Sequence, residues 1–442
     1  MNKRNVFLWS VTVAIGGFLF GFDTAVISGA EQAIQELWGL SDAVHGFAVA
    51  TALYGTVFGA MFGGRIADRQ GRKKTLIGVA LLYLVSALGS GLAPELYSFM
   101  FFRFIGGLGV GASSVVAPMY ISEIAPPDRR GRLAAMFQLN LVTGILLAYF
   151  SNYLLQDAGE NGWRWMLGIE SVPALAFAIL LFQVPRSPRW LLLQGDNGMM
   201  EEAREVLGLI NPDTVETELQ TIQADIASKP QKVSLGQFFS RTFRFPIMLA
   251  FLVAFFNQVT GINAIIYYAP RIFQMVGLEA SGAFLSTAGV GLVNLLFTLV
   301  GLYLIDRAGR RVLLIIGSVG MMITLGLVSR AFFTEQFSGV PIFIFAFIAA
   351  FAMSQGAIIW VYLAEIFPNH VRGYGNSLGS FTHWLLAAIV ANIFPPLASS
   401  LGGGAVFAFF ASMMVLQLVF SVFMMPETKG KSLEELAKTL TN

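Results

Sequence analysis

Twelve long apolar stretches constrain this chain more than any other feature. A helix needs about 20 apolar residues to cross the hydrocarbon core of a bilayer. The stretches cover residues 6–28, 46–66, 76–93, 98–120, 133–155, 164–184, 245–268, 280–305, 312–331, 341–364, 376–398 and 404–425. Because they are continuous rather than alternating, they indicate helices and not barrel strands. The sequence therefore predicts an all-α membrane protein with twelve transmembrane helices.

Composition supports the same class. Of the 442 residues, 56% are hydrophobic and 12% are charged, whereas soluble domains carry about 25% charged residues. The first apolar stretch follows Met1–Arg4 and resembles a signal peptide, but it continues to about Ile27 without a small-residue cleavage site. We therefore expect it to remain as the first helix.

The basic residues predict the orientation. Of the 28 Lys and Arg residues, all but four lie at the N-terminus, after even-numbered spans or at the C-terminus. The exceptions are Arg103, Arg164, Arg271 and Arg330. Basic residues concentrate on the cytoplasmic side, so we expect both termini in the cytoplasm and the chain in the inner (plasma) membrane. The polar segment 185–244 then forms a cytoplasmic linker, with helical stretches at Met199–Leu209 and Thr214–Ile226, rather than a catalytic domain.

An internal repeat divides the chain. YISEIAPPDRRG, from Tyr120 to Gly131, matches YLAEIFPNHVRG, from Tyr362 to Gly373, and DRQGRK matches DRAGRR. Six spans lie in each half, so the halves have the same orientation, as in major facilitator transporters. The predicted organisation is an N-terminal six-helix bundle (1–184), a cytoplasmic helical linker (185–244), a C-terminal six-helix bundle (245–425) and a cytoplasmic tail (426–442).

The repeated motifs carry charges suited to a cytoplasmic gate. Each half has D-R-x-G-R in a tight loop and a glutamate seven residues before an arginine. Arginine can bind a carboxylate through two hydrogen bonds. The hypothesis is that interhelical ion pairs close the cytoplasmic side; the alternative is solvated charges that only set topology. The predicted gate residues are Asp68, Arg72, Glu123, Arg130, Arg310, Glu365 and Arg372.

Nine motifs together resemble the sugar porter family of the major facilitators, and they span nearly the whole chain. They are GGFLFGFDTAVISG, GGRIADRQGRKK, RFIGGLGVG, YISEIAP, SPRW, NQVTGINAIIYYAP, LIDRAGRR, WVYLAEIFPNHVRG and PETKGKSLEEL. The resemblance implies a monosaccharide transporter, either proton-coupled or facilitative, for a sugar of the glucose, fructose, galactose or xylose class.

The resemblance also implies which side chains face the sugar. Planar amides can hydrogen-bond paired hydroxyls, and aromatic rings can cover the C–H face. The implied residues are Phe20, Gln138, Asn257, Gln258, Asn263, Tyr267, Asn294, Trp360, His383 and Trp384. Gln258 is the first choice among them. For a lone amide in a span, a hydrogen bond between helices is the usual alternative.

Three positions depart from the family pattern. Asn257 stands where many relatives have Gln, and His383 stands where many have an amide. His383 favours a sugar other than glucose or xylose, with fructose as one candidate. Arg186, in PRSPRW, replaces the usual Glu, which puts one cytoplasmic ion pair in doubt.

Asp23 is a candidate proton site. It lies inside the first span, where a charged side chain costs about 2.5–3.5 kcal/mol on insertion scales and therefore indicates a function. Arg103, early in the fourth span, is its natural partner, and the resemblance implies that this pair occurs in proton symporters. The hypothesis is that Asp23 binds and releases a proton as Arg103 moves. The alternative is a static structural pair.

Other function classes have less support. No phosphate-binding P-loop is present, which argues against an ATP-driven pump, and no hydrolase or metalloprotease motif indicates an enzyme. The chain has no cysteine, and its three histidines are far apart in sequence, so we expect no metal and no cofactor. Nucleic acid is not an expected partner. A passive uniporter and a sugar sensor remain alternatives to a symporter, and we expect a functional monomer.

Overall fold

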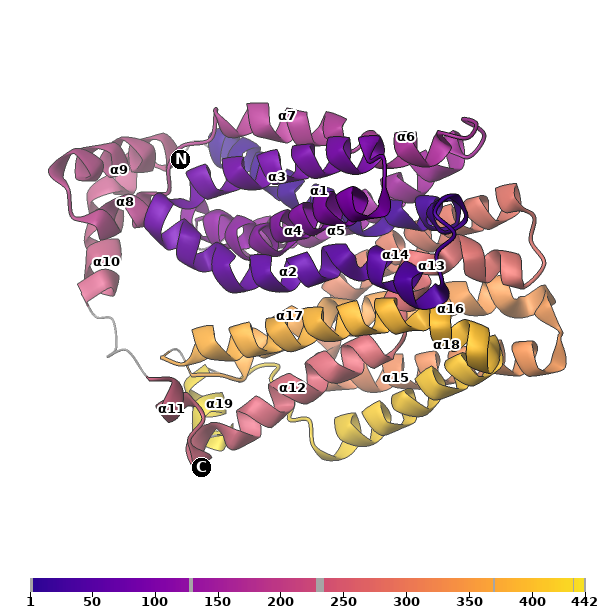
Figure 1. The fold of residues 1–442 in the computed structure, drawn as a ribbon. Coiled ribbons are helices and arrows are strands. Elements are labelled where there is room, and N and C mark those ends of the chain that lie inside the picture. The colour runs from indigo at the N-terminus through magenta and orange to yellow at the C-terminus, as the bar shows by residue number, and fades with distance from the viewer. Residues whose placement is uncertain (1–2, 127–129, 228–233, 369, 432, 441–442) are drawn as a thin grey trace. The chain divides into compact units, whose positions relative to one another are not determined.

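The computed structural model describes residues 3–126, 130–227, 234–368, 370–431 and 433–440, and the regular elements in these ranges are all helices (Figure 1). Ten stretches within them are long and apolar enough to cross a membrane. One of the ten, α18 (Arg372–Phe423), is kinked at Gly402 and contains the eleventh and twelfth predicted spans. α5 (Arg130–Leu155) matches the predicted fifth span. The twelve predicted helices are therefore confirmed.

Most other spans follow the predicted ranges to within four residues at each end, although the first continues nine residues beyond its predicted end and the seventh continues seven. The unbroken ones are α1 (Lys3–Leu37), α2 (Asp42–Gln70), α3 (Arg72–Leu92), α4 (Leu96–Ile124), α14 (Ala280–Ala308) and α15 (Arg310–Thr334). Three spans are interrupted, which the apolar pattern did not predict. They consist of α6 (Gly162–Gly168) with α7 (Ser171–Leu181), α12 (Arg244–Val259) with α13 (Ile262–Met275), and α16 (Val340–Met353) with α17 (Gln355–Glu365).

The polar segments form short helices. The linker contains α8 (Pro188–Gln194), α9 (Asn197–Ile210), η1 (Pro212–Thr214), α10 (Val215–Ala227), α11 (Leu235–Phe238) and η2 (Arg241–Phe243). η3 (Phe337–Gly339) precedes the tenth span, and α19 (Leu433–Leu440) lies in the tail. Two residues begin their helices as expected for caps, because Ser187 accepts from Trp190 N and Asp196 accepts from Gly198 N. The predicted linker helices are confirmed.

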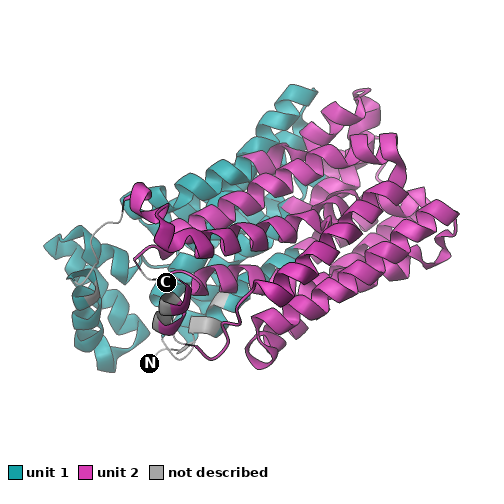
Figure 2. Cartoon of the chain, turned by 90° about the horizontal axis from the view of Figure 1, so that it is seen from below, with its two compact units in different colours: residues 1–23, 55–144, 167–231 teal, residues 24–54, 145–166, 232–442 magenta. Residues whose placement is uncertain are grey.

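Contacts divide the chain into two compact units, which Figure 2 colours separately. Unit 1 comprises residues 1–23, 55–144 and 167–231, and unit 2 comprises residues 24–54, 145–166 and 232–442. The units follow spatial contacts rather than chain order. The predicted division into bundles at residues 184, 244 and 425 remains a prediction.

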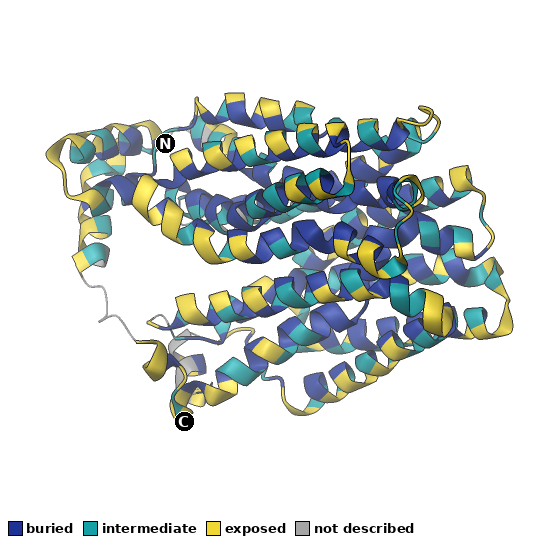
Figure 3. Ribbon diagram, viewed as in Figure 1, coloured by how far each residue is buried: buried dark blue, intermediate teal, exposed yellow. Residues whose placement is uncertain are grey.

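Burial follows stripes along the helices, with buried faces inside each unit and exposed apolar side chains on other faces (Figure 3). Phe58, Leu296 and Val419 are about half exposed. Exposed apolar side chains on helices long enough to cross a bilayer fit contact with lipid. Small residues bring helices together inside unit 1: a Cβ on Gly59 would lie 2.3 Å from the Leu108 carbonyl oxygen, so α2 and α4 pack backbone to backbone.

Candidate functional site

The break in the seventh span positions a group of amide side chains. α12 ends at Val259, and Gly261 adopts a left-handed conformation (φ +81°) before α13 begins. A Cβ on Gly261 would lie 2.4 Å from the Phe410 ring, so glycine satisfies both the backbone and the packing. Thr260 Oγ1 donates to the Asn257 carbonyl and accepts from Ile262 N, which connects the two helix ends.

Gln258 lies at the centre of this group. Its Nε2 donates to Asn257 Oδ1 (2.9 Å) and lies 3.0 Å from His383 Nδ1. Its Oε1 accepts from Asn263 Nδ2 (2.5 Å). The structure therefore brings together four of the residues predicted to face the sugar: Asn257, Gln258 and Asn263 from the broken span, and His383 from α18.

Two tryptophans flank His383. The His383 ring centroid lies 4.9 Å from that of Trp360, in α17, and 4.7 Å from that of Trp384. Trp360 is 37% exposed, whereas Trp384 is 5% exposed. An accessible indole face beside buried amides suits a ligand with hydroxyl groups on its rim and C–H bonds on its face.

The remaining predicted sugar residues are distributed over both units. Tyr267 on α13 and Asn294 on α14 are buried in unit 2. Phe20 and Gln138 belong to unit 1, where Phe20 packs against Phe137 with ring centroids 6.4 Å apart and Gln138 is half-buried. That these four residues face the same sugar remains a prediction.

The structure brings Arg103 to Asp23 inside unit 1. Arg103 Nη1 donates to Asp23 Oδ1 at 2.5 Å, and Nη2 donates to the Asp23 backbone carbonyl at 3.1 Å. Both residues are 1% exposed. Gly106 allows this approach of α4, since a Cβ there would lie 2.3 Å from Ser86 Oγ and 3.4 Å from Asp23 Oδ1.

A second carboxylate beside this pair was not predicted. Glu170 lies at the break between α6 and α7, is 1% exposed, and interacts electrostatically with Asp23 and Arg103. One buried arginine thus lies near two buried acids. The sequence contained a signal for this residue, because Glu170 is a carboxylate inside the sixth apolar stretch, just as Asp23 is inside the first.

Unit 2 contains a third buried acid that was also missed. Glu31 on α1 is fully buried and accepts from Arg271 Nε (3.0 Å) and Nη2 (2.7 Å). His45 Nε2, on α2, lies 2.9 Å from Glu31 Oε2. Gln35 links Arg271 to Asp42 at the start of α2. These contacts join residues 24–54 to the second half of the broken seventh span.

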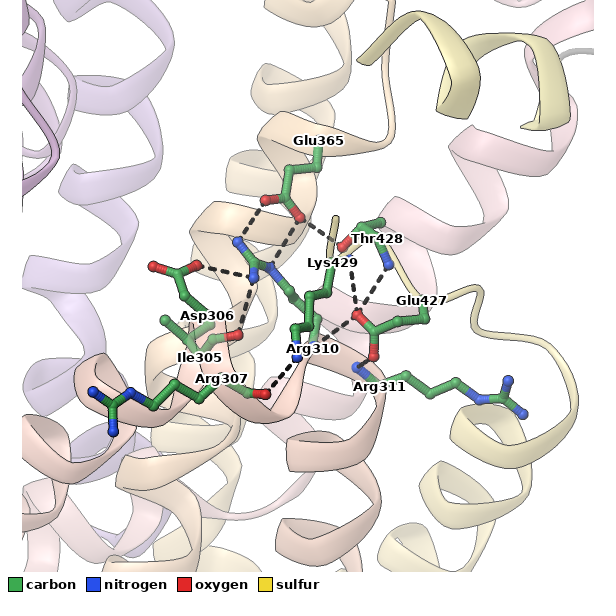
Figure 4. Close-up of polar contacts among 9 residues, drawn as sticks. All are labelled: Ile305, Asp306, Arg307, Arg310, Arg311, Glu365, Glu427, Thr428 and Lys429. Atoms are coloured by element: carbon green, nitrogen blue, oxygen red, sulfur yellow. Dashed lines mark hydrogen bonds and ion pairs between the residues drawn. The ribbon is translucent and has the colours of Figure 1, made fainter. Parts of the chain in front are cut away.

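Two matched charge clusters lie where the repeated motifs predicted them. In unit 1, Arg72 contacts Glu123 (2.8 Å) and Asp68 (3.1 Å). In unit 2, Arg310 contacts Glu365 (2.8 Å) and Asp306 (3.0 Å), as Figure 4 shows. Each pair joins two helices within one unit, so five of the seven predicted gate residues and their partner Asp306 are brought together in matching geometry.

The other two predicted gate residues, Arg372 and Arg130, are not among the residues that the structure brings together in these clusters. Arg372 Nε donates to the Phe367 carbonyl (3.3 Å) at the start of α18. The side chain of Arg130 lies outside the described residues. The doubted position, Arg186, forms an ion pair with Glu202 of α9. Sequence reasoning missed Ser187 and Thr428, which donate hydroxyl hydrogen bonds to Glu123 and Glu365, and it also missed Glu427.

A cavity of about 270 Å³ lies beside α4 in unit 1. Its lining includes Glu123, Arg189, Asn211 and Glu218, from α4 and the linker helices of unit 1. It adjoins the Arg72 cluster and shares no lining residue with the predicted sugar site.

Comparison with known proteins identifies relatives over the full length. Residues 9–440 match the family described as "Sugar (and other) transporter". The chain is 39% identical to the arabinose-proton symporter of Bacillus subtilis, over 98% of this chain and 94% of that protein. It is 35% identical to the D-xylose-proton symporter of Escherichia coli, over 98% and 96%. The inward-open structure of the xylose transporter of E. coli superposes with a TM-score of 0.87 at 34% identity, covering 98% of this chain and 100% of that one.

Proposed function

The chain belongs to the sugar transporter family, and we propose that it is a proton-coupled monosaccharide symporter that works by alternating access. The observation that carries this proposal is the buried Asp23–Arg103 pair in a multi-pass membrane protein. The relatives named as arabinose-proton and xylose-proton symporters support both the sugar and the proton. We further propose an inner-membrane location, cytoplasmic termini and a functional monomer.

The amide group in unit 2 would bind the sugar. Gln258 and Asn263 hydrogen-bond the hydroxyl groups, and the exposed face of Trp360 covers the C–H surface of the ring. That Phe20 and Gln138 also face the sugar remains a prediction from the sequence. The small set of buried amides supports recognition of a single monosaccharide ring, and the relatives are named for arabinose, glucose and xylose. A competition panel of sugars determines which monosaccharide this chain binds.

Asp23 would carry the proton. When Asp23 is ionised, Arg103 holds it; when it is protonated, the pair loses its charge attraction and α1 and α4 can separate. Glu170 keeps Arg103 partnered at that moment, because a buried arginine left without a carboxylate is costly. One proton moving down 100 mV releases about 2.3 kcal/mol, which is enough to concentrate a sugar more than tenfold.

The contact of Glu31 with Arg271 and His45 would close the sugar's route on the non-cytoplasmic side of the membrane. It ties α1 and α2 to α13, the part of the seventh span beyond the Gly261 break. The charge clusters around Arg72 and Arg310 would stabilise the cytoplasmic ends of each unit. Separation of α13 from α1 and α2 then requires the Glu31–Arg271 contact to break.

Proteoliposomes with an imposed pH gradient test proton coupling. Asp23→Asn should abolish uphill sugar uptake and retain counterflow exchange, whereas Asp157→Asn, at an exposed loop position, should behave like the wild type. Uphill uptake that persists in Asp23→Asn would refute coupling through this residue. Wild-type uptake that ignores the gradient would indicate a passive uniporter, and no uptake of any sugar would indicate a sensor.

A competition panel tests the sugar site. D-xylose, L-arabinose, D-glucose and D-fructose should compete to different extents in the wild type, and Gln258→Ala should weaken the best sugar at least tenfold, which corresponds to about 1.4 kcal/mol. Gln274→Ala, on a half-buried face of α13, is the control. Equal affinities in Gln258→Ala and the wild type would refute this site.

A further inference from the structure

A series of hydrogen-bonded, buried polar side chains runs from the amide group through α17 and α18 to α15. Asn257 Nδ2 donates to Gln355 Oε1 (3.2 Å). Gln355 Nε2 donates to Gln417 Oε1 (2.7 Å), and Gln417 Nε2 donates to Ser318 Oγ (2.9 Å). The four residues are at most 1% exposed and all belong to unit 2. The sequence analysis predicted no role for Gln355, Gln417 or Ser318.

The hydrogen bonds of this series all point one way, and Ser318 at the far end sets their direction. Ser318 Oγ donates its only hydrogen to the Leu314 carbonyl, one turn earlier in α15 (2.6 Å). Ser318 can therefore only accept from Gln417. Gln417 must turn its NH₂ group to Ser318 and its oxygen to Gln355. The same constraint passes to Gln355, whose NH₂ group faces Gln417 and whose oxygen faces Asn257.

The break in the tenth span places Gln355 in this series. Ser354 separates α16 from α17 with non-helical angles (φ −117°, ψ −89°). Its hydroxyl donates to the Ala350 carbonyl. α15 packs tightly against the break, since a Cβ on Gly317 would lie 1.9 Å from Ser354 Oγ. Gly317 and the anchor Ser318 are neighbours, so the same turn of α15 supports both the break and the series.

At its near end the series determines how Gln258 is presented. Asn257 gives its NH₂ group to Gln355, so its oxygen remains for Gln258 Nε2. Gln258 then uses its NH₂ group toward Asn257 and His383, and presents its oxygen to Asn263. Because Gln258 Nε2 is only a donor, the facing nitrogen of His383 must be an unprotonated acceptor. The free hydrogen-bonding positions of Gln258 and Asn263 are thus mainly acceptor oxygens.

We propose that Ser318, Gln417 and Gln355 form a positioning relay that sets the donor and acceptor pattern of the sugar site through Asn257. The relay rests on the proposed function, because it assigns a role to residues behind the proposed site. Asn257 is a positioning residue in this arrangement: both ends of its amide are engaged by protein groups. The sugar hydroxyl that meets Gln258 must donate its hydrogen, because both N–H groups of Gln258 are engaged by Asn257 and His383. The relay enforces this requirement by preventing the Gln258 amide from turning over.

The experiment measures half-saturation in counterflow for two relay variants and matched controls. Ser318→Ala removes the anchor, and Gln417→Met removes the next hydrogen bonds at similar side-chain length. Ser421→Ala is the control for Ser318→Ala. Ser421 is also fully buried and donates to the carbonyl one turn earlier, that of Gln417, but its side chain is not in the relay. Gln258→Ala tests the sugar site itself.

Ser318→Ala and Gln417→Met should raise the half-saturation concentration about fivefold, the effect of one hydrogen bond, while Ser421→Ala stays within about twofold. A second readout compares deoxy with deoxyfluoro analogues of D-glucose at each ring position, because fluorine can accept but cannot donate. At the position read by Gln258, the two analogues should bind equally weakly to the wild type. The relay variants should favour the fluoro analogue, since the amide can then turn its NH₂ group to the ligand.

Two results would contradict the relay, and they are distinguishable. If Gln258→Ala loses the sugar but both relay variants match Ser421→Ala in half-saturation and analogue preference, the sugar site stands and the relay is wrong. If Gln258→Ala retains wild-type affinity, the proposed sugar site is wrong and the relay has no site to position.

Discussion

The charge clusters around Arg72 and Arg310 share one plan but are completed by different parts of the chain. In each, the arginine contacts an aspartate one turn earlier, a glutamate on another helix and a backbone carbonyl five residues back. In each, the preceding glycine has positive φ, +89° at Gly71 and +95° at Gly309, in a region that is almost exclusive to glycine. The repeated sequence motifs therefore produce repeated geometry.

The clusters differ at one matched position. Pro426, Glu427 and Thr428 follow the twelfth span as Pro185, Arg186 and Ser187 follow the sixth. Glu427 accepts four backbone N–H groups, including those of Arg310 and Arg311 at the start of α15, so a carboxylate caps this helix. Figure 4 shows the arrangement.

In unit 1 a different group covers the same turn. Arg186 extends to Glu202 in the linker, and the ring of Trp190 lies against Gly71 while its Nε1 donates to the Asp68 carbonyl (2.9 Å). The first cluster is therefore held by packing from the linker, and the second by a carboxylate from the tail. The two clusters should respond differently to charge changes and to pH.

The largest effect on stability is expected at the matched glutamates of the two clusters, Glu123 and Glu365. Glu123→Gln should lower the free energy of unfolding by about 3 kcal/mol, because it removes the buried carboxylate partner of Arg72 and leaves only the exposed Asp68. Glu365→Gln should cost less, since the Glu365 side chain is 21% exposed and that of Glu123 is 7% exposed. Thermal unfolding in detergent measures both. Equal losses would show that exposure does not distinguish the clusters.

Glu427→Gln should have the next largest effect, about 1–2 kcal/mol, because the capping carboxylate becomes a neutral amide. Burial would raise the pKa of Glu427, but the four backbone N–H groups more than offset burial and hold the pKa below its ordinary value of 4.5. A lowered pKa stabilises the folded state above the ordinary value, and this stabilisation is lost as the pH falls through the folded-state pKa.

The stability gap between the wild type and Glu427→Gln should therefore stay constant from pH 8 to about 5 and close below about 4.5. Melting temperatures of the two proteins across this range measure the gap, and the variant serves as the reference because its amide does not titrate. A gap that closes near neutral pH would contradict a carboxylate cap.

Making the first cluster resemble the second should have a smaller effect. The double variant Arg186→Glu with Glu202→Arg supplies a carboxylate near the start of α3 and retains an ion pair with α9. We expect a gain of about 1 kcal/mol, the usual value of an added N-terminal cap. Glu202→Arg alone is the control, and it should destabilise slightly by placing two arginines together. No gain in the double variant would indicate that Trp190 already satisfies this turn.

The smallest effect is expected in the linker. Arg204 pairs with Glu216 across α9 and α10, and the two side chains are 43% and 66% exposed. Glu216→Gln should leave the thermal unfolding temperature almost unchanged, because exposed pairs are screened by water and salt. The variant therefore gives the lower reference for the two buried clusters. A loss as large as that of Glu123→Gln would contradict the assumption that burial decides the strength of these pairs.

Local sequence predicted much of the fold. Long apolar runs located the helices, most of them to within four residues at each end, because hydropathy acts over the length of one span. The first and seventh spans continue nine and seven residues further, because their polar ends take part in the contacts of Glu31 and Arg271 and not in the apolar pattern. The Asp23–Arg103 contact followed from the cost of charge in an apolar environment, since few partners could relieve it. The same reasoning, applied to Glu170, was sufficient to find the second acid.

The sequence by itself determined that this chain crosses a membrane many times, that its halves repeat, and that buried charges and amides lie within the spans. These are properties of composition and spacing, which each span carries alone. Only the tertiary structure decided which partner each polar group takes. Glu427 caps the start of α15, whereas Arg186, at the matched position, pairs with Glu202. Gln355 and Gln417 lie behind Asn257. The physical reason is that a buried hydrogen bond depends on atoms from helices far apart in the chain, and hydropathy contains no information about their direction.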